Sequence, residues 1–381
     1  MTLSKSDISQ RRGLIKHACY IDMNEDYIDG IYANREWPST YKGCPIFACD
    51  SSILDAPNIG YTEEQFKKLN NPHLNRLKKE LIRFRASCIA DTQSDFILTA
   101  EIVNQKKVSE IELALKHIDN LNERIGMKNT ITTYDRCYCA LELMLKHYLT
   151  ESFFVMKLKS DDYKNEIKRM TTNDEIIEIN INRNRTQNFH NKELKNQIKQ
   201  IGRLPVRITK LTLINKKGEE YTEILASNLP FEEFTAPDLK VIYGKRWKIE
   251  TNFDRLKNII HIENYSGYRE EIIQQDFYAN IFMFNFLMAM KLDADQIEEN
   301  HKDKNLKHEY KTNLNVLFGL IKLDMPNLLS HDPLERKNAI KRILKTAQSN
   351  LVEKNKNRDR NPDRKVKDPT NKYPPTQRDA E

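Results

Sequence analysis

Glycine is scarce in this sequence, with only 10 residues among 381. The motifs GxGxxG and GxxxxGK(S/T), whose glycines bring backbone N–H groups against phosphates, do not occur. This argues against a nucleotide-binding fold of either kind. The composition also excludes collagen-like, low-complexity and disulfide-scaffold chains.

The cysteines form no metal-binding pattern, because no CxxC pair occurs and no histidine stands at zinc-ligand spacing. They are Cys19, Cys44, Cys49, Cys88, Cys137 and Cys139. Several lie in apolar runs, as buried free thiols do. We interpret them as reduced and therefore expect a cytoplasmic protein.

Long apolar runs are missing as well. The N-terminus has no continuous apolar segment of the signal-peptide kind. The most apolar stretch, 279–292, is too short to span a bilayer and contains Asn280 and Asn285. It predicts a buried core helix, and no membrane partner is expected.

Charge is plentiful and slightly positive: 62 Lys and Arg against 55 Asp and Glu give a formal net charge of +7. Two interpretations remain open, an anionic partner or a soluble protein that is rich in lysine. Basic residues gather in the β-rich segment described below. They are Lys192, Lys195, Lys199, Arg203, Arg207, Lys210, Lys216 and Lys217.

The order of apolar and amphipathic runs predicts an α/β fold. Strands are expected at 46–54, twice within 81–103, at 130–135 and at 152–159, with helices at 60–80, 108–121 and 140–149. A meander followed by a parallel portion would give a mixed five-stranded sheet. Three further strands follow within 160–230, then helices to about residue 350.

The most informative helix begins near Thr235 and Pro237 and is expected to reach about residue 260. At about 100° per residue, four polar side chains fall on one edge of it. They are Tyr243, Arg246, Glu250 and Lys257. This pattern fits an amphipathic helix with an internal ion pair at i,i+4. It equally fits a metal-binding carboxylate flanked by cations that contact phosphates.

Two aspartates on apolar strands are possible partners of Glu250. Asp50 lies inside a buried strand and Asp135 ends another. A buried carboxylate is costly unless it is paired or binds a metal. Carboxylates brought together suit Mg²⁺, and two such ions could activate a water or a 3′-hydroxyl. Either aspartate could instead be a surface or turn residue.

The stretch YGKRWKIETNFDRLK, which begins at Tyr243, has the spacing Y-x(2)-R-x(3)-E-x(6)-K. It resembles the signature of DDE transposases of the IS-four, or YREK, group. FACDSSIL around Asp50 resembles the first-aspartate strand of that group. TTYDRCYC around Asp135 resembles the second, with Cys137 where glycine is usual. The resemblance covers about residues 5 to 350.

This resemblance implies an RNase H-like core interrupted by a β-rich insertion, with helical regions on either side. Asp50, Asp135 and Glu250 would hold two Mg²⁺ (or Mn²⁺) ions. The reaction would be DNA cleavage at insertion-sequence ends followed by strand transfer. Double-stranded DNA and a homodimeric synaptic complex are the implied partners. The DNA-binding residues would be Tyr243, Arg246, Lys257, Arg136, Lys245 and Trp247.

The implied division of the chain has six parts. They are an N-terminal remnant of a helical DNA-binding region (1–42), the first core part (43–160), the β-rich insertion (161–232), the second core part (233–292), a C-terminal helical region (293–350) and a disordered tail (351–381). The short N-terminus fits either a natural short form or a truncated copy.

Several alternatives stay open. Asp91 competes with Asp50 as the first aspartate, although its polar neighbours favour a turn. Trp247 would either stack on a displaced base or pack against the neighbouring sheet. The chain could also be a structure-specific nuclease on the same fold, or an inactive DNA-binding relic.

Overall fold

The computed structural model describes residues 11–34, 40–56, 82–104, 108–214, 217–300 and 309–353. The chain divides into two compact units, each built from separate stretches. We call Met1–Asn24, Asp55–Arg83 and Asp254–Glu381 the helical unit. The sheet unit comprises Glu25–Leu54 and Phe84–Phe253. The six-part division predicted from the sequence stays a prediction.

A mixed eight-stranded sheet organises the sheet unit, in the order β3-β2-β1-β4-β5-β8-β7-β6. Its strands are β1 (Ile46–Ala56), β2 (Ile82–Asp91), β3 (Ile97–Asn104), β4 (Ile131–Tyr134), β5 (Phe153–Lys157), β6 (Asp174–Asn180), β7 (Arg203–Ile214) and β8 (Glu220–Ser227). The first five agree with the predicted strands, because apolar and β-branched residues mark each of them.

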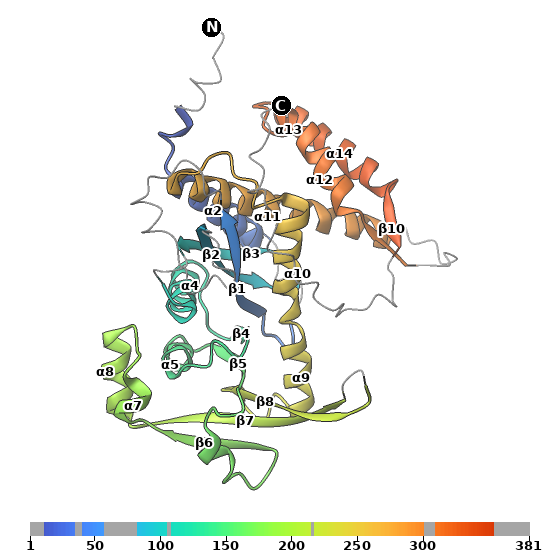
Figure 1. Ribbon diagram of the computed structural model, residues 1–381. Coiled ribbons are helices and arrows are strands. Elements are labelled where there is room, and N and C mark those ends of the chain that lie inside the picture. Colours follow the sequence, from blue (N-terminus) through green and yellow to red (C-terminus); the bar gives the residue numbers. More distant parts are fainter. Residues whose placement is uncertain are drawn as a thin grey trace. The chain divides into compact units, whose positions relative to one another are not determined.

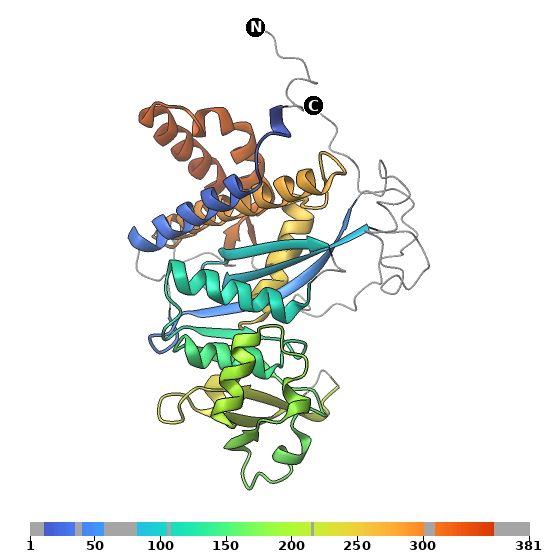
Figure 2. The same ribbon diagram turned by 90° about the vertical axis from the view of Figure 1, so that its left-hand side faces the viewer.

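The sheet combines parallel pairs at its centre with antiparallel pairs on both sides. β1, β4 and β5 pair in parallel, whereas β2 with β3, and β5, β8, β7 and β6 in succession, pair antiparallel. Parallel neighbours need a crossover, and the helices α4 (Glu110–Arg124) and α5 (Leu141–Leu149) supply it. Both lie on one face of the sheet in Figures 1 and 2, while α9 (Ala236–Gly244) and α10 (Trp247–Arg255) lie on the other. Ser109 caps α4, since its Oγ accepts from the N–H of Glu112 at 3.1 Å.

The strands of the 161–232 segment extend the same sheet, because β8 pairs with β5. This segment also contains α6 (Lys164–Ile167), α7 (Arg183–Thr186) and α8 (Lys192–Ile201), which the sequence pattern did not predict. α8 buries Leu194 and Ile198, which stand four residues apart and so share one face of a helix. The prediction of only strands within this segment overlooked that spacing.

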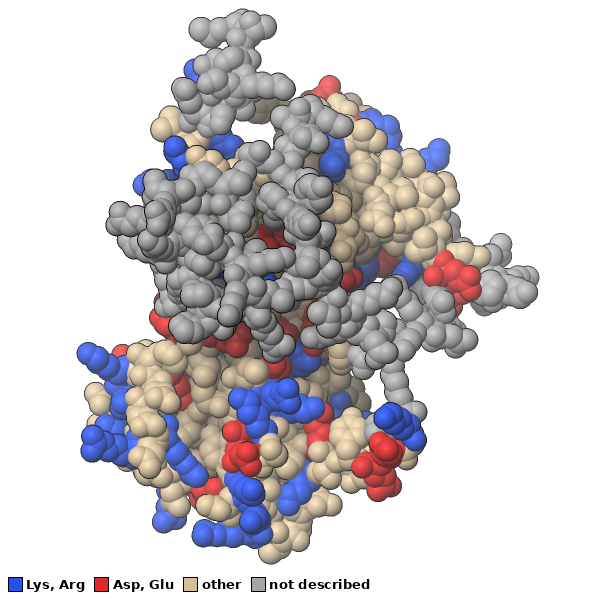
Figure 3. Space-filling view, in the orientation of Figure 1, with Lys and Arg blue, Asp and Glu red and all other residues tan. Residues whose placement is uncertain are grey.

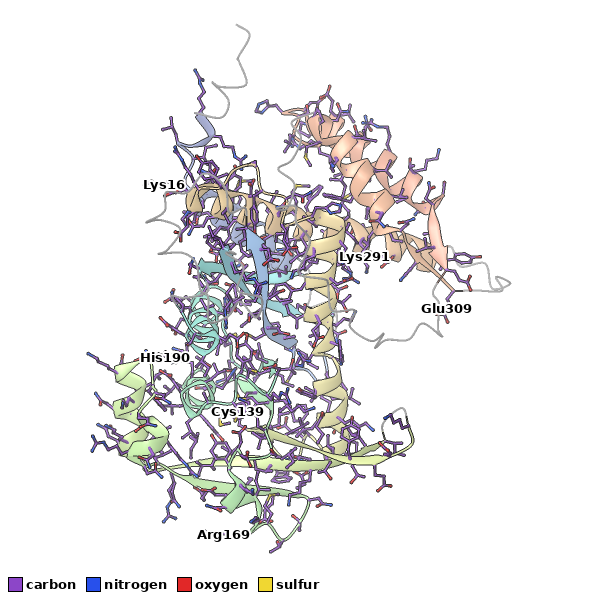
Figure 4. All side chains as sticks on the ribbon, in the orientation of Figure 1. Lys16, Cys139, Arg169, His190, Lys291 and Glu309 are labelled. Atoms are coloured by element: carbon purple, nitrogen blue, oxygen red, sulfur yellow. The ribbon has the colours of Figure 1, made fainter. Side chains whose placement is uncertain are left out.

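A polar clamp fixes the start of α8 on α4 and α5. Glu142 of α5 is buried and accepts the backbone N–H groups of His190 and Asn191 at 3.0 and 2.5 Å. His190, labelled in Figure 4, also places Nε2 2.9 Å from Ser109 Oγ. The insertion is therefore tied to the sheet by side chains as well as by strand pairing.

The helical unit centres on α11 (Glu270–Asn300), whose Phe277, Phe284 and Leu287 are fully buried. This confirms the core helix predicted at 279–292. Its other elements are η2 (Leu256–Ile260), β9 (Tyr310–Thr312), α12 (Leu314–Leu323), α13 (Met325–Leu328), α14 (Pro333–Gln348) and β10 (Leu351–Glu353). Helix α2 (Ala18–Asn34) contributes to both units.

Within the described parts of the chain, no helix is both long and apolar enough to cross a membrane. The predicted helix at 60–80, the first ten residues and the tail from residue 354 lie outside the described residues.

Candidate active site

Asp50 and Asp135 occupy matching positions on adjacent parallel strands. Ile46 of β1 pairs with Ile131 of β4, and Ala48 pairs with Thr133. Continued by two residues, this register sets Asp50 opposite Asp135, just beyond the end of β4. Neighbouring strands lie about 4.8 Å apart, and residues two apart share a face of the sheet. The two carboxylates are therefore neighbours.

The helix that carries Glu250 is divided where the sequence predicted one piece. α9 (Ala236–Gly244) ends at a glycine, a turn follows at Lys245 and Arg246, and α10 (Trp247–Arg255) continues into the π-helix η2. The prediction of a continuous helix was wrong. Glycine weakens a helix interior, and a π-turn replaces i→i+4 bonds by i→i+5 bonds, so a constant 100° per residue does not hold.

The start of α9 is fixed as predicted and is reinforced by a buried arginine. The N–H of Thr235 donates to Asp238 Oδ2 at 2.7 Å, which caps the helix. Arg207 of β7 is 2% exposed and donates to the carbonyl of Phe234 at 2.7 Å. It also forms a two-point ion pair with Asp174. Arg207 is therefore not part of the basic surface predicted for the insertion.

A second set of contacts docks α10 on the turn between β2 and β3. The Asn252 side chain is fully buried and donates to the carbonyl of Asp95 at 2.9 Å. Lys248 Nζ lies 3.4 Å from Asp95 Oδ1 on the same turn. These contacts hold the helix turn that carries Glu250 against the sheet.

Arg246 joins the helix carboxylate to the strand carboxylate. Its Nη2 donates to Glu250 Oε1 at 2.6 Å and its Nη1 to Asp50 Oδ2 at 3.3 Å. The exposed fraction of the side chain is 11% for Arg246, 19% for Asp50 and 22% for Glu250. The predicted i,i+4 pair is present, but it is one half of a bridge that reaches β1.

The Asp50 carboxyl group feels the negative charges of the other two predicted site residues. Burial raises its pKa to about 6, against the lowering effects of the Ser51 N–H and of Arg246. The negative charges of Asp135 and Glu250 raise the pKa of Asp50 further. Repulsion of this kind arises when carboxylates converge on one site.

The residues predicted to bind DNA differ in their exposure and in their contacts. The Tyr243 ring lies 5.8 Å from the Arg246 guanidinium, and burial raises the pKa of Tyr243 to about 12. Trp247 is 47% exposed, so it is not packed into the core. Lys245 lies over the ring of Tyr41 at 5.6 Å, and Arg136 is exposed beside Asp135.

Lys257 belongs to η2 of the helical unit, where its Nζ lies 4.0 Å from Glu263. Its place beside Tyr243, Arg246 and Glu250 stays a prediction.

Asp91 has a structural environment that accounts for its burial. Its carboxylate accepts from Tyr32 at 2.8 Å, from Ser94 at 2.9 Å and from the N–H of Gln93 at 2.8 Å. These bonds hold the turn after β2. Asp91 is thus satisfied without a metal, as expected of a turn residue.

Sequence reasoning missed Glu110, a further carboxylate beside the site. It is the first residue of α4, accepts a hydrogen bond from Ser51 next to Asp50, and pairs with Arg85 at 2.8 Å. An acidic residue in the first turn of a helix usually signals only a favourable helix dipole. Nothing in its spacing could therefore have marked it.

The three carboxylates suit a divalent ion by chemistry but not by their present spacing. Oxygen donors with mutual repulsion are what a hard cation relieves. Among the described residues, however, no three His, Cys, Asp or Glu side chains are grouped closely enough to hold one ion. Arg246 lies between two of the carboxylates, and its buried Nε has no hydrogen-bond partner among the described residues. The Arg246 guanidinium supplies the positive charge between Asp50 and Glu250.

Comparisons with known proteins agree with this geometry at the level of the family. No curated protein matches the sequence. Among solved structures, the chain is similar to the cryo-EM structure of a piggyBac transposase synaptic complex with hairpin DNA. The two are 11% identical, the match covers 80% of this chain and 57% of that one, and the TM-score is 0.44. This chain thus spans little more than half of that protein, and so weak a likeness carries no argument.

A family model described as "Transposase DDE domain" matches residues 45–286, which is more than half of the chain. The matched range contains Asp50, Asp135 and Glu250. The chain belongs to the family of transposases with a DDE domain.

Proposed function

We propose that this protein cleaves DNA at the ends of an insertion sequence and transfers the resulting 3′-hydroxyl into target DNA. The catalytic carboxylates would be Asp50, Asp135 and Glu250. The observation that carries the proposal is the bridge from Arg246 to Asp50 and Glu250, with Asp135 opposite Asp50 on the next strand. It makes one site from two strands and a helix.

We further assign the chain to the IS-four, or YREK, group with an RNase H-like core. The order β3-β2-β1-β4-β5, with parallel β1, β4 and β5 and crossover helices α4 and α5, supports that assignment. So does the contact between the Tyr243 ring and Arg246 next to Glu250. The proposed location is the prokaryotic cytoplasm, in association with DNA.

Asp50, Asp135 and Glu250 would hold two Mg²⁺ or Mn²⁺ ions, which supply activation of the attacking oxygen and charge stabilisation of the leaving one. For the carboxylates to close on such ions, the Arg246 guanidinium must leave its position between them. A phosphate is then its best partner, since Arg binds phosphate through paired N–H donors. Tyr243 stays protonated and can donate to the same phosphate.

The remaining proposed DNA contacts come from both units. Lys245 and the exposed Trp247 flank Arg246 in the chain, the exposed Arg136 follows Asp135, and Lys257 would complete the set from η2. A homodimer on paired transposon ends is the proposed assembly.

A strand-transfer assay tests the proposal. The substrate is linear DNA that carries the segments flanking the gene on both sides, mixed with a supercoiled plasmid and Mg²⁺. The unaltered protein should cut the ends and integrate them. Asp50→Asn should abolish both steps, while the exposed control Asp161→Asn should leave them intact.

Two outcomes would replace the proposal by an alternative. Cutting without integration of pre-cut ends would indicate a nuclease on the same fold. DNA binding without Mg²⁺-dependent cutting, unchanged by Asp50→Ala, would indicate an inactive relic.

A further inference from the structure

Helix α14 (Pro333–Gln348) of the helical unit has two unlike faces. Ala339, Ile343 and Ala347 are buried. Lys337, Lys341 and Lys345 are exposed and follow one another at intervals of four residues. Such intervals advance only about 40°, so the lysines form one stripe about 12 Å long. We call these three residues the α14 basic stripe. Figure 3 shows Lys and Arg side chains over α12–α14, at the upper right.

The other cations of α14 are used inside the protein. Arg342 forms a two-point ion pair with Asp324 at 2.9 Å. Arg336 donates to the carbonyls of Ser330 and His331 at 2.6 and 3.1 Å. The stripe lysines, by contrast, have no hydrogen-bond or ion-pair partner among the residues that the structure describes.

The stripe is unfavourable for the isolated helix. Like charges at i,i+4 repel, and this stripe contains two such pairs in succession. The only acidic residue of α14 is Glu335, which accepts a hydrogen bond from Ser330. Positive charge also continues in the sequence after β10, with Lys354, Lys356, Arg358 and Arg360. An extended anion would relieve the repulsion.

We propose that the α14 basic stripe binds the phosphate backbone of duplex DNA, independently of sequence and apart from the carboxylate site. A duplex strand presents one phosphate per about 3.4 Å of helix axis, so 12 Å of lysines matches about three to four phosphates. The linear spacing favours a regular polyanion over a folded acidic protein. The choice of DNA as the anion rests on the proposed function, and the stripe extends that function to a second DNA-contacting surface.

The test uses the full-length protein and a fluorescein-labelled 30-base-pair duplex of arbitrary sequence. Binding is followed by fluorescence anisotropy between 50 and 200 mM NaCl, without divalent ions. In the triple variant Lys337→Gln, Lys341→Gln, Lys345→Gln, the slope of log affinity against log salt should fall by about 2.7, or about 0.9 per lost phosphate contact. Between 50 and 200 mM NaCl, that difference in slope corresponds to about a 40-fold smaller loss of affinity for the variant than for the unaltered protein.

A matched control removes the same charge elsewhere. Lys192→Gln, Lys195→Gln, Lys199→Gln strips three lysines from one face of α8. It should change the slope by less than one unit. The variant with arginine at all three α14 positions should bind like the unaltered protein. Circular dichroism melts show whether the glutamine variant keeps its fold.

Each contrary outcome has a distinct meaning. Equal loss in the α8 and α14 variants would mean that net charge alone governs binding, which overturns the stripe. Unchanged duplex binding by a folded α14 variant also overturns it. A loss seen only with anionic phosphatidylserine vesicles would assign the stripe to a membrane surface instead. Failure of the unaltered protein to bind any duplex would also overturn the stripe, whereas the proposed function is decided separately by the strand-transfer assay.

Discussion

Removal of Arg246 should destabilise the protein when no divalent ion is present. Arg246→Ala leaves Asp50 and Glu250 as uncompensated, largely buried carboxylates beside Asp135. Breaking a fully buried pair costs about 3–5 kcal/mol. Because about a fifth of each carboxylate side chain is exposed, we expect about 2–3 kcal/mol. In a domain of this size, that lowers the midpoint of thermal unfolding by about 5–10 °C.

Differential scanning calorimetry in EDTA measures this loss and can separate the transitions of the two units. The same substitution in an Asp50→Asn, Glu250→Gln background should cost less than about 1 kcal/mol, because the charges that Arg246 neutralises are then absent. Added Mg²⁺ should raise the midpoint of Arg246→Ala more than that of the unaltered protein. Lys240→Ala, which removes an exposed cation of α9, serves as the control.

Two results would refute the reasoning. One is an Arg246→Ala protein as stable in EDTA as the unaltered chain. The other is the same loss in the neutralised background, which would assign the effect of Arg246 to packing rather than to charge.

Three further predictions concern other parts of the sheet unit. Burial raises the folded-state pKa of Asp50 to about 6, above its ordinary value of 3.8. Folding therefore strengthens proton binding, and the free energy of unfolding in EDTA should fall by about 2.5 kcal/mol as pH rises from 4 to 8, with about 1.4 kcal/mol of that fall between pH 5 and 7.5. Urea titrations at pH 5 and 7.5 should show this fall, and Asp50→Asn should remove it. Asn252→Ala should cost about 1–3 kcal/mol and slow DNA cutting, since Asp95 loses its contact with α10; the exposed Asn258→Ala is the control. Arg207→Met should cost about 3–5 kcal/mol by stranding Asp174, and Asp174→Asn in the same protein should recover part of it.

Much of the fold was readable from the sequence because its strands and core helices are marked by local patterns. The strand around Asp50 and the strand ending at Asp135 stand out as apolar runs between polar turns. α8 was not predicted although Leu194 and Ile198 stand at helical spacing, because polar Lys and Asn residues dominate the sequence around them. The join between β8 and β5 is a long-range pairing that no local pattern records.

For the candidate site, the sequence indicated the residue types but not the contacts between residues far apart in the chain. Spacing placed Arg246 and Glu250 one turn apart, and both lie where that spacing predicted. The contact from Arg246 to Asp50 spans 196 residues and depends on the turn between α9 and α10. Asn252 could not be singled out from the sequence. Its side chain donates to the backbone carbonyl of Asp95, and a contact with backbone leaves no mark in the sequence.

The continuity of the eight-stranded sheet has a mechanical consequence. β5, which neighbours the strand ending at Asp135, is hydrogen-bonded to β8 and through it to β7 and β6. The buried Glu142 clamp adds a second attachment. If the 161–232 segment rotated as a rigid body relative to β5, the main-chain hydrogen bonds between β5 and β8 would have to break. Force applied to the outer strands by a bound molecule must therefore travel along the sheet to the strands that carry the aspartates.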